Sequence, residues 1–110
     1  MTLFAVLFED DRQQAAEIRQ KYLERHFAFL QANAALIKTA GPLSRQGDAF
    51  AGGLWLVEAD DAAEVDRLVK EDPFWSTGLR KSVQILVWNR VFADGTRLPR
   101  QQMPPPSVTP

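Results

Sequence analysis

The sequence contains no cysteine, and this absence excludes disulfide bonds, thiolate nucleophiles and thiolate metal sites. An excess of charge of one sign is also missing, because 13 Lys and Arg residues nearly balance 14 Asp and Glu residues and leave a net charge of −1. Such a chain has no broad basic field to neutralise phosphates, so nucleic acid is not expected as a partner. No apolar run approaches the roughly 20 residues that a membrane-spanning helix needs. We therefore expect a cytoplasmic protein that does not enter a membrane.

Motifs for metal ions and nucleotides are missing too. One histidine and scattered carboxylates give no ligand spacing of the His-Glu-x-x-His kind. Gly52-Gly53 enters a strand pattern instead of opening a helix, unlike the glycines of phosphate-binding loops. Ser44 and Ser82 have no visible triad context for a nucleophilic serine. The sequence therefore predicts neither a metal ion nor an organic cofactor.

What the chain does contain is enough apolar sequence for one domain. Its 110 residues are 45% hydrophobic, which fits a single core of modest size. We place the domain at residues 1–93 and a proline-rich tail at 94–110. The prolines of the tail are Pro99, Pro104, Pro105, Pro106 and Pro110. They favour an extended or disordered end, or an arm that lies across a dimer partner.

Apolar patterning predicts four strands and two helices. The strands are expected at 3–8, 35–40, 52–58 and 83–88, and the helices at about 11–33 and 62–71. Asp10 or Asp11 can cap the first helix, with Gln14 as a capping-box partner of Asp11, and Asp60-Asp61 can cap the second. The second strand is expected to stop at Gly41-Pro42, since proline cannot donate to a ladder. The order β-α-β-β-α-β indicates an α+β, ferredoxin-like sandwich with both helices on one side of the sheet.

The predicted strands are apolar on both faces. Leu3, Ala5 and Leu7 alternate with Phe4, Val6 and Phe8, and Leu54 and Leu56 alternate with Trp55 and Val57. The helices of a two-layer fold cover one face only, so a single chain would expose a large apolar sheet. We therefore expect a homodimer in which two sheets pack face to face.

The single histidine lies within an amphipathic helical pattern. At about 100° per residue, His26 falls among apolar side chains on one face of the helix, with Arg19 seven positions earlier almost in line with it. The apolar residues of this face are Ile18, Tyr22, Leu23, Phe27, Phe29 and Leu30. Imidazole and guanidinium lose hydration when buried, so each needs a partner, a cavity or a ligand. Both a hydrogen-bonded structural histidine and a functional one are compatible with this pattern.

An aspartate follows the second predicted helix. Asp72 stands at the carboxyl end, where a negative charge opposes the helix dipole and needs a compensating partner. Because the two helices run side by side in the predicted fold, Asp72 can orient one ring nitrogen of His26 and leave the other as a general base or acid. The alternative is that Asp72 only initiates the turn at Pro73.

Other residues are candidates for ligand binding. Arg19 can bind a substrate carboxylate or phenolate through its planar fork, and Gly41-Pro42 can bring backbone close to a ligand. Phe74 and Trp88 can line a pocket for an aromatic ring, as can Tyr22 on the helical face described above. Each has a structural alternative, which is a salt bridge for the arginine, a plain turn for the glycine and proline, and core packing for the aromatic residues.

Five segments follow one another in a recognisable order. They are Arg25–Leu30, Ala40–Leu43, Gly53–Glu58, Asp72–Phe74 and Val83–Asn89. Together they resemble the successive blocks of the YciI-like family, which is defined by the YCII-related domain. The resemblance implies a dimeric α/β barrel of ferredoxin-like subunits, and an active-site pair that falls on His26 and Asp72. Phe27 departs from the leucine that usually follows the family's histidine, which narrows the pocket.

The resemblance also implies acid–base chemistry without an obligatory metal or organic cofactor. Relatives include a dehydrochlorinase for a chlorinated hydroxyhydroquinone, and the broader barrel superfamily includes muconolactone isomerase. We therefore expect a small homodimeric enzyme in which His26 and Asp72 move a proton on a small, cyclic or aromatic organic molecule, by isomerase, lyase or dehydrochlorinase chemistry. Two other classes stay open: a non-catalytic metabolite-binding or accessory module, and a cofactor-independent monooxygenase.

Overall fold

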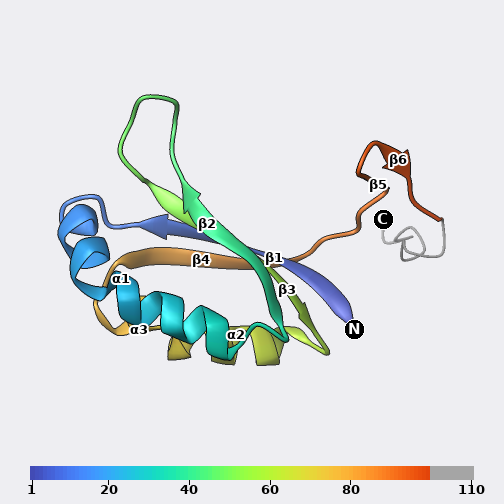
Figure 1. The fold of residues 1–110 in the computed structure, drawn as a ribbon, viewed down its shortest axis with the longest axis horizontal. Coiled ribbons are helices and arrows are strands. Elements are labelled where there is room, and N and C mark those ends of the chain that lie inside the picture. The colour runs from blue at the N-terminus through green and yellow to red at the C-terminus, as the bar shows by residue number, and fades with distance from the viewer. Residues whose placement is uncertain (100–110) are drawn as a thin grey trace, which may run out of the picture.

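A computed structural model describes residues 1–99 as a four-stranded antiparallel sheet with helices on one side (Figure 1). The strands are β1 (Thr2–Asp10), β2 (Ile37–Leu43), β3 (Gly52–Ala59) and β4 (Arg80–Val87). The helices are α1 (Ala15–Ala32), α2 (Ala62–Glu71) and the single turn α3 (Pro73–Ser76), and a short hairpin of β5 (Phe92–Ala93) and β6 (Thr96–Arg97) follows. The sheet order is β2-β3-β1-β4. This arrangement confirms the predicted α+β, ferredoxin-like fold.

Alternation along the strands places the core between the sheet and the helices. In the β1–β3 pair, Phe4 lies opposite Val57 and Val6 lies opposite Trp55, and all four side chains are buried. Residues of α2 complete this cluster: Val65, Leu68 and Val69. Burying these apolar groups is the main term that holds the helix layer on the sheet, at about 25 cal/mol per Å².

The opposite face of the sheet is apolar, and none of the helices in the described part of the chain covers it (Figure 1). Leu54 and Leu56 of β3 lie opposite Leu7 and Ala5 of β1, and Leu86 of β4 lies on the other side of Ala5. Leu7 is 36% and Leu86 45% exposed. The sequence prediction of two apolar faces is therefore confirmed, and residues 1–99 leave one of them uncovered.

The start of α1 differs from its prediction. Asp10 does not cap the helix, because it is the last residue of β1 and its buried carboxylate binds two arginines. Asp11 accepts a hydrogen bond from Gln13 N, which makes a local turn before the helix begins. The capping residue is Gln14, whose side chain makes no capping hydrogen bond. The expected capping box is thus wrong, because the carboxylates beside the helix start are used elsewhere.

The second strand also differs. β2 begins at Ile37 and ends at Leu43. We had expected it to stop at Gly41-Pro42, but both residues pair with β3. Proline is tolerated there because β2 is an edge strand and needs no donor on its outer side. The second helix agrees with its prediction, since Asp61 accepts a hydrogen bond from Glu64 N and α2 ends at Glu71.

The hairpin after β4 extends away from the sheet (Figure 1). Its turn is Asp94-Gly95, and both residues have positive φ, at 53° and 72°. The boundary that we expected between residues 93 and 94 therefore falls inside a paired element. Residues 100–110, which contain most of the expected proline-rich tail, lie outside the described residues. Within residues 1–99, no helix has the length and hydrophobicity needed to cross a membrane.

Candidate active site

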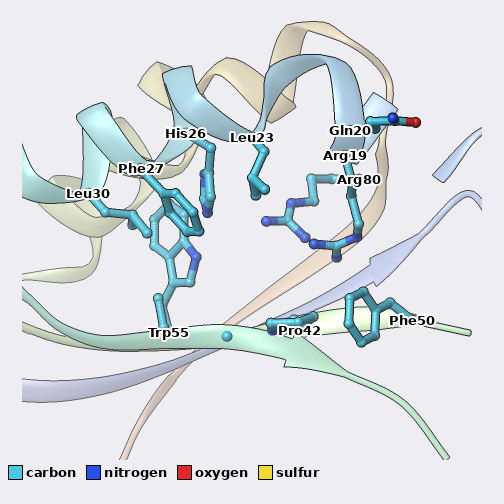
Figure 2. Close-up of a pocket in the computed structure, with 13 residues that line it drawn as sticks. Arg19, Gln20, Leu23, His26, Phe27, Leu30, Pro42, Phe50, Trp55 and Arg80 are labelled. Carbon is cyan, nitrogen blue, oxygen red and sulfur yellow. The ribbon is translucent and has the colours of Figure 1, made fainter. Parts of the chain in front are cut away.

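A cavity of about 340 Å³ lies between α1 and the strands β2 and β3 (Figure 2). Its walls are mostly apolar, with a group of polar side chains on the α1 side. The lining residues are Arg19, Gln20, Leu23, His26, Phe27, Leu30, Ala40, Gly41, Pro42, Phe50, Gly53, Trp55 and Arg80. A space of this size, with few polar groups and apolar walls, suits a small organic molecule with a ring.

His26 and Asp72 are in direct contact at one wall of the cavity. His26 Nδ1 lies 2.8 Å from Asp72 Oδ1, and both residues are buried, at 8% and 2% exposure. A carboxylate only accepts hydrogen bonds, so Nδ1–H donates and Nε2 is the ring nitrogen left for a ligand. Figure 2 shows the His26 ring directed from α1 into the cavity. The contact has the geometry in which a carboxylate orients a histidine for proton transfer.

The turn between α2 and α3 holds Asp72 in place. Its backbone is extended at φ −63° and ψ 131°, and it joins the carboxyl end of α2 to the amino end of α3. Asp72 Oδ1 accepts a second hydrogen bond from Phe74 N at 3.1 Å. The carboxylate is thus both an N-cap for α3 and a hydrogen-bond partner of His26, so the turn and the contact with His26, which the sequence left as alternatives, occur together.

Phe74 supports the site from behind. Its ring stacks on the His26 ring with centroids 4.3 Å apart and an interplanar angle of 27°, and it is completely buried. The guanidinium carbons of Arg19 and Arg80 lie 5.7 and 5.4 Å from the centre of the same ring. One buried aromatic ring therefore contacts the histidine and both arginines, and fixes their relative positions.

A buried ion-pair network continues from the histidine. Asp10 Oδ2 accepts a hydrogen bond from Arg19 Nη2 at 2.6 Å, and Asp10 Oδ1 accepts one from Arg80 Nη1 at 3.0 Å. Arg80 Nη2 lies 3.8 Å from Asp72 Oδ2. Burial lowers the pKa of Arg80 below its ordinary value, and the attraction of Asp10 and then Asp72 partly offsets this effect. The network contains two cations and two anions, so it is neutral when His26 is neutral.

Some of the residues proposed from the sequence line the cavity and some do not. His26, Arg19, Gly41 and Pro42 line it, and Asp72 lies directly behind His26. Those that are not among the lining residues are Tyr22, Phe74 and Trp88.

Each of these three has a structural reason for its position. Tyr22 packs against the buried cluster that contains Phe74 and Leu79, on the side of α1 that faces α3. Trp88 follows β4 and its backbone N donates to Leu3 O, at the end of β1 opposite Asp10. Leu23 and Phe27, which we placed on the apolar face of this helix with His26, are 37% and 46% exposed because they line an open cavity.

Asp10 and Arg80 were not predicted as residues of the site. A signal for Asp10 was present, since Phe4, Val6 and Phe8 alternate on the buried face of β1 and Asp10 continues that period of two. A carboxylate on a buried face needs a cationic partner. No sequence pattern identified that partner as Arg80, which lies 70 positions later and pairs with Asp10 across the β1–β4 ladder.

Within residues 1–99, no group of three or more His, Asp or Glu side chains is placed to hold a metal ion. The polar side chains that line the cavity are the imidazole of His26, the guanidinium groups of Arg19 and Arg80, and the amide of Gln20. These groups can transfer a proton and bind an anion.

Comparison with solved structures finds a dehydrochlorinase that is similar in both sequence and fold. The chain is 26% identical to 5-chloro-2-hydroxyhydroquinone dehydrochlorinase from Burkholderia phenoliruptrix, in complex with 2,5-dihydroxybenzoquinone, with a TM-score of 0.70 over 78% of this chain and 92% of that chain.

Two further structures match at lower similarity. An uncharacterised NIPSNAP domain protein from Burkholderia xenovorans is 13% identical, with a TM-score of 0.47 over 80% of this chain and 92% of that chain. A dimeric protein of unknown function with a ferredoxin-like fold from Bacteroides fragilis is 15% identical, with a TM-score of 0.46 over 79% of this chain and 93% of that chain. No curated protein matches the chain.

The family comparison covers nearly the whole described fold. Residues 3–89 match the YCII-related domain, from the start of β1 to just beyond β4. The match confirms the resemblance noted in the sequence, and the chain belongs to the YCII-related domain family.

Proposed function

We propose that this protein is an enzyme that transfers protons on a small cyclic or aromatic organic substrate, with His26 as the general base and acid and Asp72 as its orienting partner. The observation that carries the proposal is the 2.8 Å contact between His26 Nδ1 and Asp72 Oδ1 at the wall of a 340 Å³ cavity. A histidine held in this way has one fixed nitrogen and one that faces the ligand space.

The geometry supports a simple reaction. His26 Nε2 removes a proton from a carbon or oxygen of the substrate, and Asp72 stabilises the imidazolium that forms. In an elimination, the electron pair of the broken C–H bond forms a double bond and the halide leaves with the C–X pair. In an isomerisation, the imidazolium returns the proton to another atom of the same molecule. The buried position of the pair keeps bulk water from competing for the proton.

The shape and lining of the cavity support a ring-shaped substrate. Phe27, Pro42, Phe50 and Trp55 supply apolar surface around the space. The dehydrochlorinase that shares this fold acts on a chlorinated hydroxyhydroquinone and was crystallised with a dihydroxybenzoquinone. We therefore propose hydroxylated aromatic or quinone-like rings, with or without a halogen, as the substrate class.

A substrate panel tests this proposal. The protein is incubated with halogenated and halogen-free hydroxyhydroquinones and with small unsaturated lactones, and halide release, isomer formation and oxygen uptake are measured. We expect halide release or isomerisation without oxygen uptake. Oxygen consumed in step with turnover would instead identify a monooxygenase, and binding without turnover across the panel would identify a metabolite-binding module.

We also propose that two copies of the chain form a homodimer through the uncovered face of the sheet. That face carries Leu7, Leu54, Leu56 and Leu86 in adjacent positions on three strands. Packing two such faces removes the apolar surface from water and encloses each sheet between two layers, the helices of its own chain and the sheet of the second copy.

Leu7→Glu is expected to convert the dimer to a monomer. Leu7 lies on a central strand, with Leu54 and Gln84 on either side, so the substitution would place two carboxylates near the middle of the interface. Burying an unpaired charge is costly, and we expect the dissociation constant to rise at least roughly 100-fold. Sedimentation velocity at micromolar concentration measures the change. Lys70→Glu is the control, because the Lys70 side chain is exposed on α2, and it should leave the dimer intact. A wild-type monomer would contradict the proposal.

A further inference from the structure

The two partly buried arginines of the site keep N–H donors that make no hydrogen bond within residues 1–99. Asp10 accepts one hydrogen bond from each guanidinium group. Arg19 Nη2 also donates to Gly52 O, whereas Arg80 Nη2 makes no hydrogen bond within residues 1–99. Among the described residues, Arg19 Nε, Arg80 Nε and Asp72 Oδ2 are buried without a hydrogen-bond partner. The two Nε atoms are closed off from the cavity, whereas Arg80 Nη2, whose nearest carboxylate oxygen is Asp72 Oδ2 at 3.8 Å, belongs to a residue that lines it and is the donor a ligand can use.

Both guanidinium groups lie at the cavity. Arg19 and Arg80 are among its lining residues, and Figure 2 shows them next to each other, facing Pro42 and Phe50 across the space. The Arg80 side chain is only 3% exposed, so it meets the cavity and little bulk water. Its position is fixed from two sides, by the Phe8 ring 4.1 Å from its guanidinium carbon and by Asp10.

The charges leave room for one anion. Asp10 is shared by two arginines, and Asp72 is shared by His26 and Arg80. The network is neutral with a neutral histidine and carries one positive charge once His26 accepts a proton. An anionic oxygen at the arginines balances the charge of the network when His26 is protonated. When His26 takes a proton from the substrate, the substrate gains the matching negative charge, and the guanidinium groups stabilise an oxygen that carries it.

We infer that Arg80, together with Arg19, binds an anionic oxygen of the substrate, so that the site selects ring compounds that carry a phenolate, enolate or carboxylate over their neutral analogues. This inference rests on the proposed function for its reaction, but it concerns binding and can be tested without turnover. Arg80 contributes Nη2, which makes no hydrogen bond within residues 1–99 and lies 3.8 Å from Asp72 Oδ2, the carboxylate that also contacts His26. Charge-assisted hydrogen bonds of this kind are among the stronger ones in proteins.

The test compares two probes of similar shape. 2,5-Dihydroxybenzoquinone is a vinylogous acid that is anionic in neutral buffer, and 2,5-dimethoxybenzoquinone is its neutral ether. Isothermal titration calorimetry measures both dissociation constants. We expect the wild type to bind the anion at least roughly tenfold more tightly than the ether, and Arg80→Met to weaken anion binding by roughly 10- to 100-fold while ether binding changes less than about threefold. Substitution of a residue that has only a structural role would not change the ratio of the two dissociation constants.

Two further variants complete the design. Arg80→Lys keeps the positive charge but loses the planar guanidinium group, so we expect an intermediate loss of preference for the anion. This variant replaces Arg80→Met if Arg80→Met does not fold. Lys81→Met removes a charge from the next residue of β4, whose side chain is 67% exposed, and should keep the wild-type preference. Equal binding of the two quinones by the wild type, no binding of either, or an unchanged preference in the Arg80 variants would overturn the inference. Anion preference without turnover of any panel compound would leave the inference standing and contradict the proposed function.

Discussion

His26→Gln is expected to lower kcat by roughly 10²- to 10⁴-fold for the substrate that the panel identifies, which is the usual contribution of a general acid–base group. Glutamine retains polar atoms near the cavity but cannot accept and return a proton. Binding of a quinone probe should change only a few-fold, because the proposed anion contacts lie at Arg19 and Arg80. Steady-state turnover and probe titration separate the two effects.

Asp72→Asn is expected to lose less activity than His26→Gln. The amide keeps a hydrogen-bonding shape beside His26 Nδ1 and Phe74 N, but it lacks the charge that stabilises an imidazolium. Glu24→Gln, on the exposed side of α1, is the matched carboxyl-to-amide control and should retain wild-type kcat. Full activity in His26→Gln would reject the mechanism even if the cavity binds the substrate.

The parts of the fold that follow local rules could be predicted from the sequence. A period of two along β1 and β3 identified both faces of the sheet. Asp61 was a recognisable cap because the donor that it binds, Glu64 N, is only three residues away. The start of α1 could not be predicted in the same way. Asp10 looked like a cap from its neighbours, but its carboxylate binds arginines at positions 19 and 80, and that tertiary demand outweighs a local capping bond.

The candidate site was predictable only in part, for a related reason. His26 and Asp72 stood out because a lone imidazole on an apolar face and a carboxylate at a helix end both require partners, and the fold brings the two together. Phe74 could not be assigned to the cavity or to the layer behind it, since an apolar ring suits both. Arg80 precedes the strand that we expected at 83–88, whereas β4 begins at Arg80 itself, and the burial of its side chain follows only from sheet register.

Asp10→Asn is expected to reduce the free energy of unfolding by about 3–5 kcal/mol, the range found when one partner of a buried ion pair is removed. The substitution keeps the size of the side chain but leaves Arg19 and Arg80 close together without the anion that both contact. Asp10 is 2% exposed, so water cannot replace the lost charge easily. Urea denaturation at one fixed protein concentration measures the change, because a dimer's stability depends on concentration.

Two variants show whether the loss comes from the buried network. Asp11→Asn changes the neighbouring exposed aspartate and should stay within about 0.5 kcal/mol of wild type. Arg80→Met combined with Asp10→Asn removes one of the two uncompensated cations, so the double variant should lose less stability than the sum of the single losses. Additive losses, or an Asp10→Asn variant as stable as Asp11→Asn, would contradict a network in which Asp10 neutralises both arginines. If the losses are not additive, Asp10 is the residue that keeps Arg19 and Arg80 side by side at the cavity. In this arrangement Arg80 can bind an anion.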